Sequence, residues 1–151
     1  MTLRTSLRDA LARTAGPPRL AVVSDWHVGA ALATAYDSVD VRLVTDHAGV
    51  AGQVPDGVRV TVGDLTAVDT LQGATDAAAA VVALQSDRRA LLVTQLLRTQ
   101  FDIDSVVVLL NDPQRRDAIA DLASAVVCGS TCLATELQRT VETTLGEAES
   151  V

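Results

Sequence analysis

Short apolar runs alternate with stretches of helical periodicity along most of the chain, starting at residue 20. Aliphatic runs bounded by turn residues predict strands, and apolar residues three or four positions apart predict helices. The predicted strands cover residues 20–23, 39–45, 58–62, 77–84, 106–110 and 125–128. The predicted helices cover residues 28–36, 67–72 and 87–99, followed by one that begins at Pro113 and one that closes the chain.

This alternation predicts an α/β fold, namely a Rossmann-like, doubly wound parallel sheet of six strands in the order 3-2-1-4-5-6. Ahead of the first strand, apolar residues at helical spacing predict an extra helix (Leu3, Leu7, Ala10 and Leu11). The chain therefore divides into an N-terminal helical appendage at residues 1–18, one α/β domain at 19–145 and a tail at 146–151.

The turn after the first predicted strand, within LAVVSDWHVGAAL, lies where dinucleotide-binding folds carry three glycines. The first glycine makes the tight turn, the second lets the pyrophosphate approach the backbone, and the third packs helix on strand. Ser24 stands at the first position, Trp26 at the second and Gly29 at the third. An indole at the second position takes the space of the phosphates, so the architecture is nucleotide-binding while the phosphate cradle is damaged.

Two aspartates follow later strands. Asp46 comes roughly 20 residues past the turn, where an acidic residue would bind ribose hydroxyls, although an Asp at a strand end is also a common turn residue. Gly63-Asp64 closes the third strand, and Asp64 with Thr66 is suited to cap the short helix that follows.

Composition limits the partners. Hydrophobic residues make up 48% of the 151, with one Trp, one Tyr and one Phe, so one aliphatic core is expected. The net charge of −7 opposes binding to nucleic acid or to an anionic membrane. No apolar run reaches the ~18 residues of a membrane span, and the N-terminus has no apolar signal core, which predicts a cytoplasmic protein. Cys128 and Cys132 are expected to be buried free thiols, with a cross-link or metal ligation as alternatives.

Several segments together resemble one family. They are VVSDWHVGAAL, RLVTD, VTVGDLTAVDTL, AAAAVVALQSDRRALLVTQLL, VVVLLNDPQRRDAIADL and AVVCGSTCLATEL, within residues 19–140. With Gly63-Asp64 and Asn111-Asp112-Pro113 as its most specific pieces, the chain resembles the TrkA N-terminal (RCK N-terminal) domain family, the cytosolic regulatory module of potassium channels and transporters.

The resemblance implies a regulatory role in potassium transport, a membrane transporter subunit as partner, and a site for NAD or an adenine nucleotide. By position it assigns Gly29 to the helix start, Asp46 to the ribose and Asp64 to the neighbourhood of the adenosine. The replaced glycines leave weak or vestigial binding, and no ligand at all, as open alternatives. The candidate cofactor-binding residues are Ser24, Asp25, Trp26, His27, Gly29, Asp46 and Asp64.

Two other functions start from the same residues. Ser24-Asp25-Trp26-His27 resembles the S-D-x-H opening of calcineurin-like metallophosphoesterases, in which Asp25, His27 and Asp64 would ligate a metal. The chain has only two histidines, His27 and His47, so the later ligands of such a bimetal site are missing. The third possibility is a domain that binds only protein partners, its cleft filled by Trp26. No nucleophile and base pair stands out, and we interpret the chain as a non-enzyme.

Two helices predict an interface. The 87–99 helix is apolar around nearly its full circumference, which predicts burial on all sides. The last helix carries an apolar stripe at four-residue spacing (Leu133, Leu137, Val141 and Leu145). Either the N-terminal helix or a second subunit could cover these surfaces. Because the resembling family pairs subunits at this edge, we expect a two-fold homodimer.

Overall fold

The computed structural model describes residues 17–149. The predicted N-terminal helix therefore lies outside the described residues. The strands are β1 (Arg19–Ser24), β2 (Asp40–Thr45), β3 (Arg59–Val62), β4 (Ala79–Ala83), β5 (Val106–Leu110) and β6 (Ala125–Cys128). The α-helices are α2 (His27–Thr34), α3 (Ala48–Ala51), α4 (Val68–Leu71), α5 (Asp87–Gln100), α6 (Arg116–Ala120) and α7 (Gly129–Glu149). Short 3₁₀ turns follow α4 (Gln72–Ala74) and precede α6 (Pro113–Arg115).

All six strands are parallel and lie in the order β3-β2-β1-β4-β5-β6, which confirms the predicted fold and topology. In register, Val23 of β1 lies between Val44 of β2 and Val82 of β4. The strand order switches at β1: β2 and β3 lie on one side of β1 in the sheet, and β4 to β6 lie on the other side. Ligands of open α/β folds bind at the carboxyl ends of the strands beside such a switch point.

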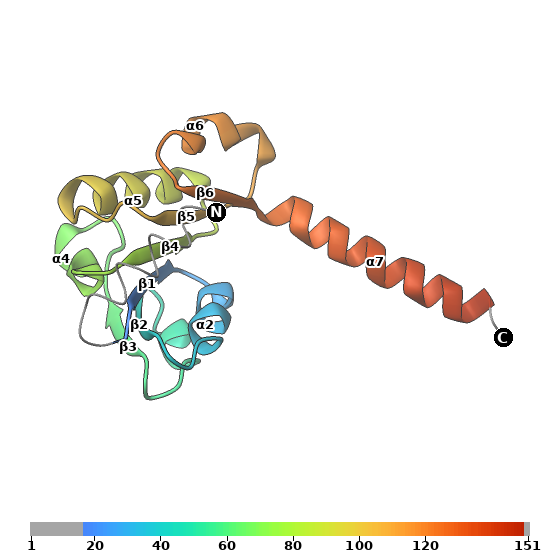
Figure 1. Cartoon of the computed structure of the whole chain (residues 1–151), viewed down its shortest axis with the longest axis horizontal. Coiled ribbons are helices and arrows are strands. Elements are labelled where there is room, and N and C mark those ends of the chain that lie inside the picture. Colours follow the sequence, from blue (N-terminus) through green and yellow to red (C-terminus); the bar gives the residue numbers. More distant parts are fainter. Residues whose placement is uncertain (1–16, 150–151) are drawn as a thin grey trace.

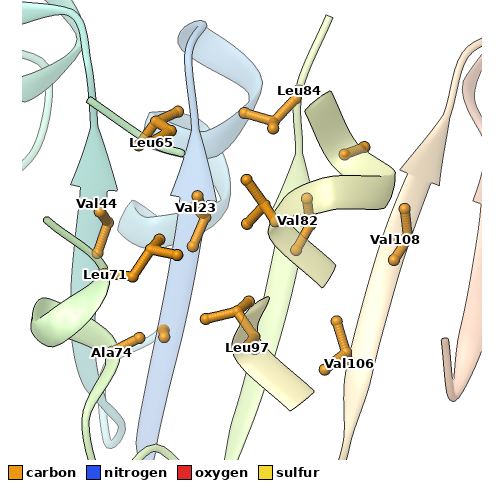
Figure 2. Packing of buried hydrophobic residues seen from close by; sticks show 14 of the residues in the cluster. Val23, Val44, Leu65, Leu71, Ala74, Val82, Leu84, Leu97, Val106 and Val108 are labelled. Carbon is orange, nitrogen blue, oxygen red and sulfur yellow. The ribbon is translucent and has the colours of Figure 1, made fainter. Parts of the chain in front are cut away.

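The larger hydrophobic core lies between the sheet and the helices α4, α5 and α6 (Figures 1 and 2). Alternate residues of each strand enter it, since successive side chains of a strand point to opposite faces. Figure 2 shows Leu71 and Ala74 against Val23 and Val44, and Leu97 of α5 beside Val82.

Within the described residues, the opposite face of the sheet is covered over only half of its width. Helices α2 and α3 pack on β1 and β2 and bury a second cluster of aliphatic residues (Val22, Ala30, Ala33, Val41, Leu43 and Val50). On β4, β5 and β6, four aliphatic residues facing this side belong to neither core cluster and stay partly exposed (Val81, Val107, Leu109 and Val127). They are neighbours across the strands, so within the described residues they form one continuous aliphatic surface. We call this surface the open sheet face.

Helix α5 corrects one prediction. Ala90, Val93, Thr94 and Leu97 are buried, whereas Leu92 is 42% exposed. The helix is thus buried along one stripe and not on all sides. The sequence was misleading because Leu92 is apolar but faces away from the sheet.

Helix α7 leaves the domain at the end of β6 and extends away from the sheet (Figure 1). It continues through Gly146 to Glu149, where the sequence suggested a tail. Its apolar stripe stays exposed, with Leu133 at 63%, Leu137 at 65%, Val141 at 53% and Leu145 at 58%. The stripe has no cover within the described part of this chain.

The packing of α5 predicts a clear contrast between two leucines. Leu97→Ala empties a fully buried position and should lower the free energy of unfolding by about 2–5 kcal/mol. Leu92→Ala makes the same chemical change on the exposed side and should cost less than about 1 kcal/mol. Urea unfolding followed by circular dichroism measures both, and equal losses would contradict the one-sided burial of α5.

Candidate functional site

The turn between β1 and α2 is held by a very close approach of helix and strand. A Cβ atom added at Gly29 would overlap the side chain of Ser24 and lie 3.5 Å from Cγ1 of Val22. Only glycine fits there without a shift of α2. The position thus has the packing role of the third glycine in the dinucleotide-binding turn.

Ser24 and Trp26 fill the place where a pyrophosphate would approach the backbone. The buried Ser24 hydroxyl donates to the carbonyl oxygen of Ala83, at 2.7 Å, at the end of β4. The indole Nε1 of Trp26 donates to the same oxygen at 3.1 Å. The crevice between the ends of β1 and β4 is therefore bridged by the protein's own side chains.

Asp25 and Asp46 are joined by an arginine that the sequence analysis did not single out. Arg89 lies in the first turn of α5, and its Nη1 is 3.2 Å from Oδ2 of Asp25. Its Nη2 is 2.8 Å from Oδ2 of Asp46. The other oxygen of Asp25 accepts from the backbone N–H of Gln85 at 3.1 Å. One guanidinium thus ties together the ends of β1, β2 and β4.

Asp64 lies at the end of β3 and is exposed. Its Oδ1 accepts from the backbone N–H of Thr66 at 2.9 Å and from the Thr66 hydroxyl at 2.8 Å. These two hydrogen bonds hold the pKa of Asp64 below its ordinary value, with a smaller effect from Arg89. The N-cap of α4 is Ala67, without a side-chain bond, so Asp64 orders its own turn and does not cap the helix as expected.

A hollow of about 300 Å³ lies beside this crevice. Its lining includes both histidines of the chain and residues from three loops (Asp25, Trp26, His27, His47, Gly49, Val50, Gln53 and Gln85). The rings of Trp26 and His27 meet edge to face with centroids 5.4 Å apart. Nδ1 of His47 accepts from the backbone N–H of Gly49, which leaves Nε2 as the donor of a neutral ring. A volume at the lower end of the range for ligand pockets suits a nucleoside better than a whole dinucleotide.

The predicted site residues therefore fall into two groups. In the first group, Ser24, Asp25, Trp26 and Asp46 gather at the ends of β1, β2 and β4, with His27 at the start of α2 beside them. The second group consists of Gly29, which packs α2 on β1, and Asp64, which is bonded within its own turn after β3. The sequence analysis missed His47, Gln85 and Arg89. The only available signal for Arg89 was its place in the first turn of the helix after β4, at the edge of the switch point.

The alternative metal site is not formed. Among residues 17–149 no group of three or more His, Cys, Asp or Glu side chains is arranged to hold a metal ion. Asp25, one of its three expected ligands, is instead occupied by Arg89 and Gln85. Within the described residues the structure therefore does not bring Asp25, His27 and Asp64 together as a metal site.

The two cysteines differ. Cys128 is buried, as expected, but Cys132 lies exposed on α7, so the prediction of two buried thiols was half wrong. Both are free thiols. Hydrogen bonds from Ser130 and Thr131 lower the pKa of Cys128 to about 7. The cause of the difference is tertiary, because Cys132 follows the point where α7 leaves the sheet.

A parallel six-stranded sheet with a crevice at its β1 switch point defines a nucleotide-binding-fold domain of the Rossmann type. The family model of the TrkA-N domain matches residues 27–129, and the chain belongs to that family.

Solved structures agree with this fold. The TrkA-N domain of the inner membrane protein YbaL from Escherichia coli superposes with a TM-score of 0.71 at 15% identity, covering 84% of this chain and 98% of that one. The NAD(P)-binding domain of an exopolyphosphatase-related protein from Archaeoglobus fulgidus gives 0.68 at 17%, covering 82% and 97%. The GsuK RCK domain gives 0.66 at 22%, covering 91% of this chain and 31% of that one. A search of curated sequences finds no match.

The contact at Gly29 predicts a large effect from a single methyl group. Gly29→Ala should lower the free energy of unfolding by about 1–3 kcal/mol, because the new Cβ displaces α2 from β1. At Gly57 an added Cβ meets no atom within 4 Å, so Gly57→Ala serves as the matched control with an effect near zero. Thermal and urea unfolding of both variants check this, and a neutral Gly29→Ala would refute the close approach.

Proposed function

We propose that this domain is a regulator of potassium transport that binds an adenine nucleotide weakly and works as a homodimer. Membership of the TrkA-N family supports the regulatory part. The observation that carries the ligand part is the crevice at the ends of β1, β2 and β4, with Asp46 at the ribose position. A membrane transport protein is the proposed partner, and the cytoplasm the proposed location. Among residues 17–149, no helix is long and apolar enough to cross a membrane.

Weak binding follows from what already occupies the crevice. Trp26 is hydrogen-bonded to Ala83 in the space of the pyrophosphate, so a dinucleotide would have to expel the indole. Asp25 and Asp46 pair with the guanidinium of Arg89 and Asp64 lies within its electrostatic reach, so each phosphate beyond the first meets an excess of carboxylates. We therefore rank ligands with few phosphates above ATP and NAD.

The hydrogen bond of the Ser24 hydroxyl supports a binding function over catalysis, because it engages this hydroxyl within the protein. His27 and His47 line the hollow, whereas Ser24 is not part of its lining and its hydroxyl donates to the carbonyl oxygen of Ala83. A dehydrogenase must hold its dinucleotide firmly in place, which the bridged crevice opposes. The remaining alternative is a domain that binds only proteins. The Trp26 indole also favours this alternative, because it fills the space of a ligand's pyrophosphate.

Two surfaces support the homodimer. Within the described residues, each copy presents an exposed apolar stripe on α7 and an open sheet face beside the start of that helix. Parallel sheets are normally covered on both faces. In a two-fold pair the same surfaces of both copies meet, so α7 of each copy would cover the open sheet face of the other. Helix α7, with 21 residues, is ~32 Å long and can reach across a partner domain.

Binding to the crevice should change the fluorescence of Trp26, the only tryptophan in the chain. AMP, ADP, ATP and NAD at millimolar concentration, in high salt to protect an acidic protein, should shift its emission and raise the melting temperature. We expect the effect to decrease from AMP to ATP. No change in either readout with any of the four would leave the domain that binds only proteins as the better reading.

The dimer should be visible by sedimentation at micromolar concentration. Leu137→Glu places a charge in the middle of the exposed stripe and should yield monomers, because the buried carboxylate has no partner. Thr135→Glu adds the same charge on the far side of α7 and should leave the dimer intact. A wild-type protein that sediments only as a monomer would refute the pairing.

A further inference from the structure

Arg89 crosses the crevice from one side to the other. It starts in α5, which follows β4, and reaches Asp46 at the end of β2. Because β1 lies between β2 and β4, the side chain passes over the carboxyl end of β1, where it also meets Asp25. The nucleotide of a Rossmann fold lies across this same place, with the ribose at the β2 acid and the phosphate at the β1 turn.

The contacts of Arg89 coincide with both parts of such a ligand. Asp46 is the carboxylate that would accept the ribose hydroxyls, and its Oδ2 is already taken at 2.8 Å. Asp25 belongs to the turn that would face the phosphate, and its Oδ2 is taken at 3.2 Å. Within the described residues, Arg89 is the cation that pairs with these two carboxylates.

The ion pair between Arg89 and Asp46 can be broken because both side chains are partly exposed. The side chains of Arg89 and Asp46 are 33% and 31% exposed, and ion pairs at this exposure are weak. A ligand can therefore break the bond to Asp46 at modest cost. The freed guanidinium then lies beside the phosphate position, and its planar fork matches phosphate oxygens. Trp26 has removed the backbone cradle, so no competing phosphate donor from a glycine turn is available.

We propose that Arg89 is a movable bar across the crevice that leaves Asp46 when a nucleotide enters and then binds its phosphate, which makes the site selective for an adenosine monophosphate. This inference rests on the proposed nucleotide site and names the residue that sets its ligand. The bar lowers affinity for any nucleoside by occupying Asp46. It restores affinity only for a ligand that offers an anion in exchange. Three carboxylates around one guanidinium then disfavour further phosphates.

Calorimetric titration with adenosine and with AMP separates these two effects. The wild type should bind AMP roughly tenfold more tightly than adenosine, the ratio expected for one charge-assisted hydrogen-bonded contact. Arg89→Ala should abolish this preference and bind adenosine roughly threefold more tightly, because Asp46 is freed. Arg89→Lys keeps the charge without the fork and should keep part of the preference for AMP.

Arg88→Ala is the matched control. Arg88 is the preceding residue of the same helix, carries the same charge and lines a different hollow, between α5 and α6. It should keep the wild-type ratio of AMP to adenosine affinity. Circular dichroism and the melting temperature of each variant verify folding, and Arg89→Lys carries the test if Arg89→Ala unfolds.

The outcomes are distinct. If Arg89→Ala weakens the binding of adenosine and of AMP equally, Arg89 has a structural role only. That result would overturn the inference while the nucleotide site stands. Binding of adenosine to Arg89→Ala but not to the wild type would support the bar. If no variant, including the wild type, binds either ligand, the nucleotide part of the proposed function fails and the bar fails with it.

Discussion

The packing of α2 on β1 at Gly29 fixes the geometry on which the rest of the site depends. With no side chain at Gly29, the first turn of α2 descends onto Ser24, and the Ser24 hydroxyl turns to the carbonyl of Ala83 on β4. That bond joins the two strands at the switch point of the sheet. It also positions the turn in which the indole Nε1 of Trp26 donates to the same carbonyl oxygen. The close approach of the Gly29 backbone to the Ser24 side chain thus affects both where the crevice lies and what fills it.

Charged side chains at the carboxyl ends of the strands also shape the crevice. Carboxylates from β1, β2 and β3 end at one edge because the carboxyl ends of parallel strands meet there. Uncompensated, Asp25 and Asp46 would repel each other. Arg89 reaches them from α5 and converts two strand ends into one ion-paired network. The guanidinium that pairs with both carboxylates is also the group best suited to a phosphate, so the proposed ligand choice depends on this one side chain.

The sheet itself is unevenly covered, and the reason lies in the connections. Helices α2 and α3 follow β1 and β2 and stay over that half of one face, whereas α4, α5 and α6 cover the other face. Helix α7 extends outward after β6 and, in this chain, covers neither (Figure 1). An aliphatic sheet surface and an aliphatic helix stripe therefore remain together at one end of the domain. These two apolar surfaces are the ones that a second copy would cover in the proposed homodimer.

The sequence alone predicted the fold, because short aliphatic runs such as Val106–Leu110 alternate with stretches of helical periodicity, an order typical of a parallel α/β sheet. It also located the crevice, since Gly29, Trp26 and Asp46 lie at fixed offsets from the first two strands. It could not reveal Arg89, because Asp25 and Arg89 are 64 residues apart and meet only after β1 and β4 pair. Nor could it show that Leu92, Cys132 and the α7 stripe are exposed, since hydropathy gives a preference for burial and the neighbouring elements decide whether burial occurs.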